Sequence, residues 1–326
     1  MTVLASELYS DPVPLQLGPS KRALTLDLSV SSSLRNAWND EGFVVLERAV
    51  PVDTIDAYNE IVRTVRQSYP NGRDAYGHGD RIGQLHQKHP DLLAAVNRDM
   101  ILSFLRWAFG EDPKVFASLN FQRGTQQEAH IDAIFFWPEP AYAMAGVWIA
   151  LEDISPEAGP LFYISGSQKW PFLQSQHVVA GRPDLAARRE AARRGDLDPA
   201  SLGSVIQDLG QAWTADFLEL EARSGGVRVP RVIRKGDAVV WHSLLAHGGT
   251  PRINPALSRV SAVFHFFGET AGLFTNEQFF LHSQREIRDL QPQTPPIERF
   301  KGGVKYMRFP YFVTYDGGAE LVHPLS

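Results

Sequence analysis

The chain has 326 residues, of which 44% are hydrophobic and 21% charged, and this ordinary globular composition excludes a disordered, collagen-like or coiled-coil protein. With 32 basic against 37 acidic side chains the formal net charge is -5, so we expect no nucleic acid partner and no anionic lipid. The absence of cysteine excludes disulfides, thiolate metal ligands and a thiol nucleophile. Any metal must therefore be held by nitrogen and oxygen.

The start of the chain shows neither a basic leader nor a long apolar run, and no stretch approaches the roughly 18 apolar residues that a membrane span needs. We therefore expect a cytoplasmic protein with no membrane partner. Shifts in composition predict a single domain over 1–326. Its parts are an N-terminal arm at 1–22, a mainly helical flank at 23–110, a β core at 111–268 and a C-terminal extension at 269–326.

Helices are expected in the flank because apolar residues recur there at three- and four-residue spacing between capping and turn residues. They cover 31–41, 51–68 and 91–109. A short apolar strand at 43–47 follows Gly42, which ends the first helix. The intervening region has histidines at metal-like spacing, but no carboxylate pattern or strand context supports a metal site there, so we interpret it as a lid or surface loop. These histidines are His78, His86 and His89.

Short β-branched and aromatic runs separated by glycine and proline turns fill the β core, which is typical of a sandwich or barrel. The predicted strands cover 114–122, 131–137, 145–154, 159–165, 227–233, 237–245 and 259–267. A helix rich in alanine and arginine interrupts them near 183–200. Its arginines either lie in water or meet an anionic substrate at a pocket mouth. They are Arg188, Arg189, Arg193 and Arg194.

The first candidate metal ligands are His130 and Asp132, at the start of a strand-like run. Side chains at i and i+2 of a strand point to the same face, so both could reach one metal ion at about 2 Å. The same pattern also fits a histidine that is only hydrogen-bonded to a nearby carboxylate. A third ligand is needed to decide between the two interpretations.

Residues 236–249 supply two further histidines. His247 ends an apolar run just before a glycine turn, where an imidazole could face a cavity, and His242 lies five residues earlier. Odd spacing puts the two on opposite faces of a strand, so only one of them can point inward. Two histidines and one carboxylate form the facial triad of non-haem iron(II) oxygenases, which leaves three coordination positions open.

Arg259 and Ser261, twelve and fourteen residues after His247, again stand at i and i+2 of a predicted strand. A guanidinium fork and a hydroxyl on one face suit a planar carboxylate. A dicarboxylate could therefore span from the metal to Arg259. A surface arginine beside a turn is the alternative.

The order of these motifs, His-x-Asp, a distal histidine and then Arg-x-Ser, resembles the phytanoyl-CoA dioxygenase family of iron(II)/2-oxoglutarate oxygenases. The resemblance runs from about residue 34 to 268 and includes 40–46, 146–153, 157–161 and 165–167. It implies a mainly β fold with flanking helices, namely a double-stranded β-helix (jelly-roll, cupin-like). Ile131 and Gln168 depart from residues that are common in relatives, and neither is a ligand position.

The resemblance also implies roles for individual residues. Iron(II) would be held by His130, Asp132 and His247. Arg259 would bind the distal carboxylate of 2-oxoglutarate, assisted by Ser261.

Two more residues match family positions near the co-substrate, and a third lies on the same strand face as one of them. Each also has a plainer interpretation. They are Asn120, Gln122 and Trp148. The first two would instead bond to the backbone of the barrel, and the tryptophan would be a core aromatic. The aromatic run at 135–137 similarly either lines the pocket or belongs to the core.

As the resemblance implies, 2-oxoglutarate would chelate the iron and be decarboxylated with dioxygen to succinate and carbon dioxide, which drives oxidation of an unactivated C–H bond in a small-molecule substrate. Because Asp132 is a carboxylate, no coordination site is freed for chloride, and hydroxylation is favoured over halogenation. A substrate from secondary metabolism is expected. The alternative is a jelly-roll that binds a metal or ligand without turnover.

Overall fold

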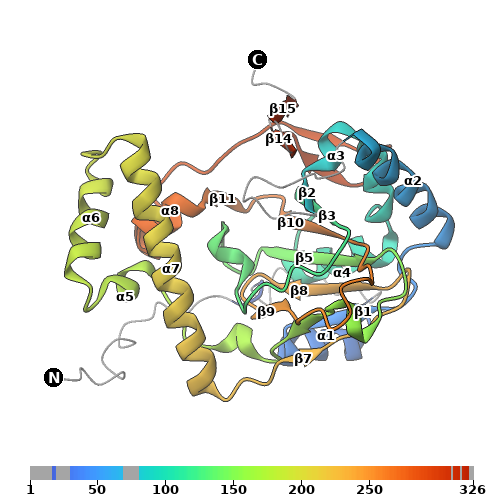
Figure 1. Ribbon diagram of the computed structural model, residues 1–326, viewed down its shortest axis with the longest axis horizontal. Coiled ribbons are helices and arrows are strands. Elements are labelled where there is room, and N and C mark those ends of the chain that lie inside the picture. The colour runs from blue at the N-terminus through green and yellow to red at the C-terminus, as the bar shows by residue number, and fades with distance from the viewer. Residues whose placement is uncertain (1–16, 20–29, 69–80, 310, 316–317, 323–326) are drawn as a thin grey trace.

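The computed structural model describes residues 17–19, 30–68, 81–309, 311–315 and 318–322, so most of the expected N-terminal arm, and His78, lie outside the described residues. A large sheet of eight strands forms its centre (Figure 1). These strands are β1 (Phe43–Leu46), β2 (Arg81–Gly83), β3 (Pro113–Phe121), β5 (Met144–Ala150), β8 (Ala238–His242), β10 (Ser261–Gly268), β12 (Ile297–Arg299) and β13 (Lys305–Met307). Their order is β1-β8-β5-β10-β3-β13-β12, and β2 also pairs with β3.

Smaller sheets accompany the large one. A three-stranded sheet has the order β7-β6-β9, with β6 (Leu161–Tyr163), β7 (Val229–Pro230) and β9 (His247–Gly249). Two further antiparallel pairs are β4 (Phe136–Glu139) with β11 (Gly272–Thr275) and β14 (Tyr311–Tyr315) with β15 (Gly318–Val322). Tyr163 of β6 packs in one apolar cluster with Trp148 and Trp241, so the three-stranded sheet lies against one face of the large sheet.

Helices cover the opposite face of the large sheet (Figure 1). They are α1 (Ser32–Glu41), α2 (Val52–Ser68), α3 (Leu85–Lys88), η1 (Pro90–Ala95) and α4 (Asp99–Phe109). Because strand side chains alternate, Val147 and Ile149 of β5 pack against these helices while Trp148 faces the other way. The predicted helices at 31–41 and 51–68 and the short strand after Gly42 are confirmed.

A second group of helices packs at one end of the sheets, on the left in Figure 1. It contains α5 (Ser175–Val179), α6 (Pro183–Arg193), α7 (Pro199–Ser224), α8 (Asn276–Leu281) and α9 (Gln284–Ile287). The 3-10 turns η2 (Asp132–Ile134), η3 (Pro156–Ala158) and η4 (Ser167–Lys169) lie in loops between strands.

Three features of the fold differ from the sequence-based expectations. The helix expected at 91–109 is two helices, because the extended backbone of Arg98 separates η1 from α4, and Asn97 between them accepts a hydrogen bond at Oδ1 from the backbone N–H of Val304 at 3.0 Å. The helix expected near 183–200 ends at Arg193, and the long α7 follows it, capped by the side chain of Asp198. The C-terminal extension is not only a tail, since its strand β13 pairs in parallel with β3.

Candidate metal centre

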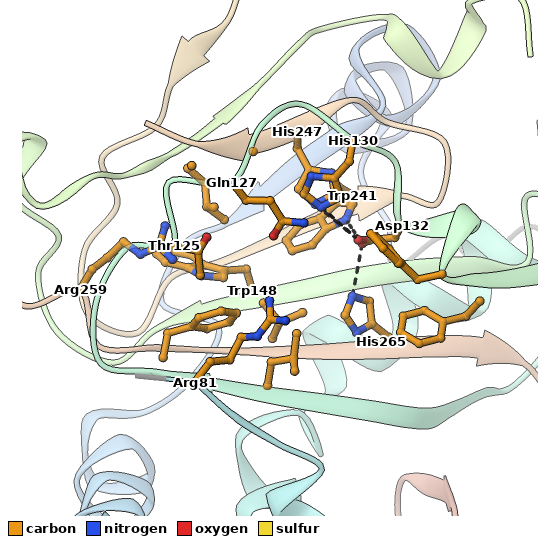
Figure 2. A pocket seen from close by; sticks show the side chains of 18 residues that line it. Arg81, Thr125, Gln127, His130, Asp132, Trp148, Trp241, His247, Arg259 and His265 are labelled. Atoms are coloured by element: carbon orange, nitrogen blue, oxygen red, sulfur yellow. Dashed lines mark hydrogen bonds and ion pairs between the residues drawn. The ribbon is translucent and has the colours of Figure 1, made fainter. Parts of the chain in front are cut away.

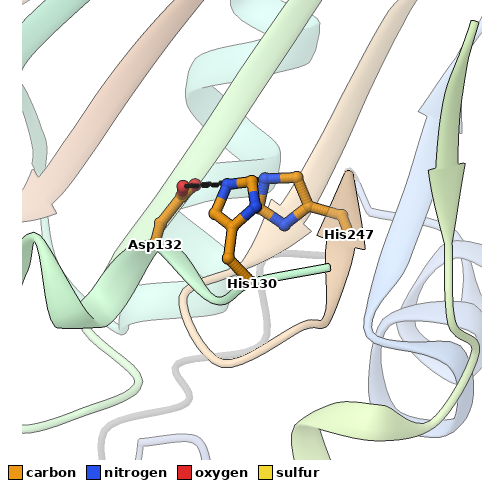
Figure 3. Close-up of side chains that lie close together, drawn as sticks. All are labelled: His130, Asp132 and His247. Atoms are coloured by element: carbon orange, nitrogen blue, oxygen red, sulfur yellow. Dashed lines mark ion pairs between the residues drawn. The ribbon is translucent and has the colours of Figure 1, made fainter. Parts of the chain in front are cut away.

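The three predicted metal ligands lie together in the structure (Figure 3). His130 and His247 exchange two backbone hydrogen bonds, each 3.0 Å long, and Asp132 begins the turn η2 directly afterwards. The Nε2 atoms of His130 and His247 lie 3.8 Å and 3.6 Å from Oδ1 of Asp132. The run 131–137, which was expected to be one strand, is a turn followed by β4. The ligands are brought together by the backbone bridge between the two histidines and by this turn, and not by the alternation of side chains along a strand.

Both imidazoles are held in the tautomer that a metal requires. His130 Nδ1 lies 2.8 Å from the carbonyl oxygen of Glu128, and His247 Nδ1 lies 3.0 Å from that of Leu245. A carbonyl only accepts hydrogen bonds, so each Nδ1 carries the hydrogen and each Nε2 keeps its lone pair for a cation. Burial and the neighbouring His247 lower the pKa of His130 to about 4, which keeps its ring neutral at neutral pH.

The second oxygen of Asp132 is bonded to two side chains that the sequence analysis did not single out. Trp241 Nε1 donates to Oδ2 at 2.7 Å, and His265 Nε2 lies 3.2 Å from the same atom. Burial by itself raises the pKa of Asp132, but its interactions with His247 and His265 outweigh that effect and leave the pKa below its ordinary value. The carboxylate is therefore ionised and can ligate a cation.

His242, the alternative ligand, does not belong to this centre. Its buried ring packs 5.6 Å from the ring of Trp38 in α1, and its Nδ1 accepts a hydrogen bond from the backbone of Leu244 at 3.1 Å. Strand β8 ends at His242, and His247 begins the separate strand β9 after a turn. The two histidines thus lie on different strands, which leaves His247 as the second imidazole of the metal group.

The candidate ligands open into a pocket with mostly apolar walls (Figure 2). Arg259, Trp148, Phe135 and Phe136 line it, whereas Trp137 packs instead against Phe172 and Phe279. Polar lining residues that the sequence analysis missed are Arg81, Thr125, Gln127, Trp241 and His265. Of these, only His265 could have been predicted from the alternation of side chains along a strand, since it lies on the same strand face as Ser261 four residues earlier.

Arg259 lies within this pocket and is 1% exposed. One of its terminal nitrogens donates to the carbonyl of Gly159 at 3.1 Å, and its guanidinium lies 5.6 Å from the ring of Phe121 and 6.0 Å from that of Trp148. Burial lowers its pKa to about 10, so the group remains cationic at neutral pH. Arg259 Nε and Trp148 Nε1 are buried donors without a hydrogen-bond partner in the described part of the chain.

The other predicted co-substrate residues do not line the pocket. Asn120 faces the helical side of β3, where it accepts a hydrogen bond from the hydroxyl of Tyr58, because its neighbours Leu119 and Phe121 take the pocket face. The expectation that it contacts a co-substrate is therefore wrong.

Gln122 and Ser261 act on the backbone of Arg259. The carbonyl of Gln122 accepts from the Arg259 N–H at 3.0 Å, and the hydroxyl of Ser261 donates to the Arg259 carbonyl at 3.3 Å. Neither side chain lies in the lining of the pocket, so both support the loop that carries Arg259.

The arginines of the inserted helix bind other parts of the protein, which disfavours the alternative interpretation that they meet an anionic substrate at a pocket mouth. Arg189 is buried and donates to the carbonyls of Phe280 and Leu281 at 2.8 and 2.7 Å. The other three arginines pair with carboxylates, in the pairs Arg188–Asp208, Arg193–Glu286 and Arg194–Asp196. They connect α6 to α7 and α9 or close the turn between α6 and α7, and none lines the pocket.

A family model described as phytanoyl-CoA dioxygenase matches residues 38–261. Phytanoyl-CoA dioxygenase domain-containing protein 1 of Mus musculus is 25% identical over 175 residues, which is 52% of this chain and 50% of that protein. Its Rattus norvegicus counterpart is 25% identical over 215 residues, or 64% and 63% of the two chains. The matches thus span between half and 63% of the length of these curated relatives.

Solved structures show the fold of this chain. The non-heme alpha ketoglutarate dependent carbocyclase SnoK from nogalamycin biosynthesis is 16% identical with a TM-score of 0.56, covering 86% of this chain and 98% of its own. EctD from S. alaskensis with bound Fe is 18% identical with a TM-score of 0.55, covering 81% and 87%. These similarities confirm the jelly-roll fold with flanking helices. Among the described residues, no helix combines the length and apolar character of a membrane span.

Proposed function

The chain belongs to the phytanoyl-CoA dioxygenase family, and from this premise we propose that it is an iron(II)- and 2-oxoglutarate-dependent dioxygenase. It would hydroxylate a small-molecule substrate, or otherwise oxidise it at an unactivated C–H bond, using dioxygen and releasing succinate and carbon dioxide. The observation that carries the proposal is that the metal ligand group and the buried Arg259 face one pocket.

The residues present fit iron(II). Two imidazoles whose Nδ1 atoms face backbone carbonyls and whose Nε2 atoms face the centre, together with one ionised carboxylate, make up the nitrogen and oxygen donor set of the facial triad. The ligands His130, Asp132 and His247 would take three positions of the ion and leave three open. When bound, iron(II) supplies the activation of dioxygen that no side chain provides.

The pocket also fits a dicarboxylate co-substrate. Arg259 keeps a full positive charge in an apolar enclosure, and among the described residues its Nε and Trp148 Nε1 are buried donors without partners. A carboxylate would satisfy such donors, because an unpaired buried donor costs about 1–3 kcal/mol. Arg259 would bind the distal carboxylate of 2-oxoglutarate, on a loop that Ser261 and Gln122 hold through the backbone.

The remaining lining residues shape the place of the substrate. Leu119, Phe121, Phe135, Phe136 and Val263 exclude water from the pocket, which suits a substrate with an apolar part. Asp132 keeps its carboxylate at the centre, which favours hydroxylation over halogenation. A substrate from natural product biosynthesis is part of the proposal, and the similarly folded SnoK comes from nogalamycin biosynthesis.

The test is an anaerobic titration of the protein with iron(II) and 2-oxoglutarate, which gives a weak visible charge-transfer band when the co-substrate chelates the metal. We expect the band in the wild type and its loss in His247→Ala, after which succinate release identifies substrates. A folded wild type without the band would contradict the proposal. It would favour the alternative function of a jelly-roll that binds a ligand without turnover.

A further inference from the structure

Three neighbouring strands of the large sheet each contribute one residue to a row of paired positions that runs across the sheet beside Asp132. His265 of β10 stands opposite Gly146 of β5, and Gly146 stands opposite Trp241 of β8. The two outer residues bond the same atom, Oδ2 of Asp132, at 3.2 Å and 2.7 Å (Figure 2). We call His265, Gly146 and Trp241 the carboxylate platform.

The middle residue of the carboxylate platform must lack a side chain. A Cβ atom on Gly146 would lie 2.3 Å from Cε2 and 2.7 Å from Nε1 of Trp241. Packed atoms do not approach so closely, so a side chain at this position would displace the indole. Gly146 therefore leaves the space in which Trp241 lies over β5 and reaches Asp132.

The two carboxylate oxygens of Asp132 have different surroundings. Oδ1 faces the free Nε2 atoms of His130 and His247. Oδ2 accepts from the Trp241 N–H and, because an ionised carboxylate only accepts, from an Nε2–H of His265 as well. Bonds from two buried donors to an ionised oxygen are strong, and breaking them to bind a cation through Oδ2 would leave both donors unpaired.

We infer that the carboxylate platform restricts Asp132 to ligation through Oδ1 alone. A carboxylate that bound through both oxygens would occupy a fourth position on the ion. The platform thus preserves the three open positions that co-substrate and dioxygen need. This inference rests on the proposed function and adds the positioning residues that act on the metal through Asp132.

Cobalt(II) titration of the whole protein without co-substrate tests the inference, because the visible absorption of cobalt(II) reports its coordination number. His265→Phe and Trp241→Phe each remove one donor to Oδ2 and keep a ring in its place. We expect each to weaken cobalt binding about 10- to 100-fold and to shift the spectrum toward a higher coordination number. Gly146→Ala should act like Trp241→Phe, and the two changes combined should cost no more than either one.

Matched controls separate this role from simple packing. His265→Gln retains an N–H donor and should restore most of the affinity and the wild-type spectrum. His242→Phe removes a buried histidine of the neighbouring position in β8 that does not touch Asp132, and it should bind cobalt like the wild type.

Wild-type affinity and spectrum in folded His265→Phe and Trp241→Phe would overturn the inference, as would a loss in His242→Phe equal to theirs. A wild type that binds no cobalt overturns both the platform and the proposed function. A wild type that binds cobalt but shows no charge-transfer band with iron(II) and 2-oxoglutarate overturns the proposed function only.

Discussion

Both faces of the large sheet bury histidines, but only one face uses them as candidate ligands. On the helical face, His86 Nδ1 lies 2.7 Å from the Ser118 hydroxyl and its Nε2 lies 3.0 Å from the Gln87 amide. On the pocket face, His130 and His247 turn Nδ1 to a carbonyl and Nε2 to Asp132.

The pKa does not distinguish the two faces. Burial lowers the pKa of His86 to about 3, and burial together with His247 lowers that of His130 to about 4. A neutral buried imidazole is therefore common to both faces. A candidate ligand is distinguished by two features: its Nδ1 is hydrogen-bonded to a backbone carbonyl, and its Nε2 faces a carboxylate.

The largest expected effect is that of Asp132→Ala, which removes the carboxylate of the candidate ligand group. Coupled substrate turnover should be abolished and iron(II) binding should weaken more than about 100-fold. Succinate release and metal titration measure these quantities. Undiminished product formation by the variant would refute the proposed ligand group.

Arg259→Gln should have the next largest effect. Loss of a charged donor costs about 1.5–3 kcal/mol, so the 2-oxoglutarate concentration needed for half-maximal turnover should rise roughly 10- to 100-fold. Metal binding without co-substrate should not change. An unaltered 2-oxoglutarate requirement would show that another residue, of which Arg81 is the first candidate, binds the distal carboxylate.

His86 on the helical face should affect stability but not metal binding. Its folded pKa lies below the unfolded value of 6.5, so its contribution to stability is complete above pH 6.5 and is lost as the pH falls toward about 3. From pH 7 to pH 5 this group alone should lower the free energy of unfolding by about 2 kcal/mol. Urea denaturation should therefore show a flatter pH profile for His86→Gln than for the wild type. Parallel profiles would contradict the assignment.

Trp148→Phe should have the smallest effect. It removes one neutral donor worth about 0.5–1.5 kcal/mol, which corresponds to a two- to roughly tenfold rise in the 2-oxoglutarate requirement. Trp137→Phe is the matched control, because this tryptophan is also buried but packs on Phe172 and Phe279. Equal effects of the two substitutions would deny Trp148 a specific role.

Local sequence patterns predicted the helical flank and pointed to the candidate ligands, whereas they could not predict the pairing of strands that are distant in the sequence. His130, Asp132, His247 and Arg259 were accessible because their chemistry and order are informative by themselves. The orientation of Asn120 could not be predicted from the sequence, since it depends on which face of β3 the helix α2 covers. The long α7 was missed although its buried residues recur every three or four positions.

Predicting the contacts to Asp132 from the sequence would have required the pairing register of three strands. Trp241 has the sequence context of an ordinary core residue, and only the pairing of β8, β5 and β10 brings it and His265 to one oxygen. The need for glycine at position 146 likewise comes from a neighbouring strand, because the indole of Trp241 fills the space that a side chain would occupy.

The backbone bridge between His130 and His247 also has a thermodynamic consequence. Most of the β core lies between these two residues, and an ion held by both would act as a removable cross-link that the unfolded chain lacks. At a free iron(II) concentration of about 100 times the dissociation constant, the folded state would gain roughly 2.7 kcal/mol. Melting temperature would then report occupancy of the centre directly, and ligand screening by thermal shift could begin without a known substrate.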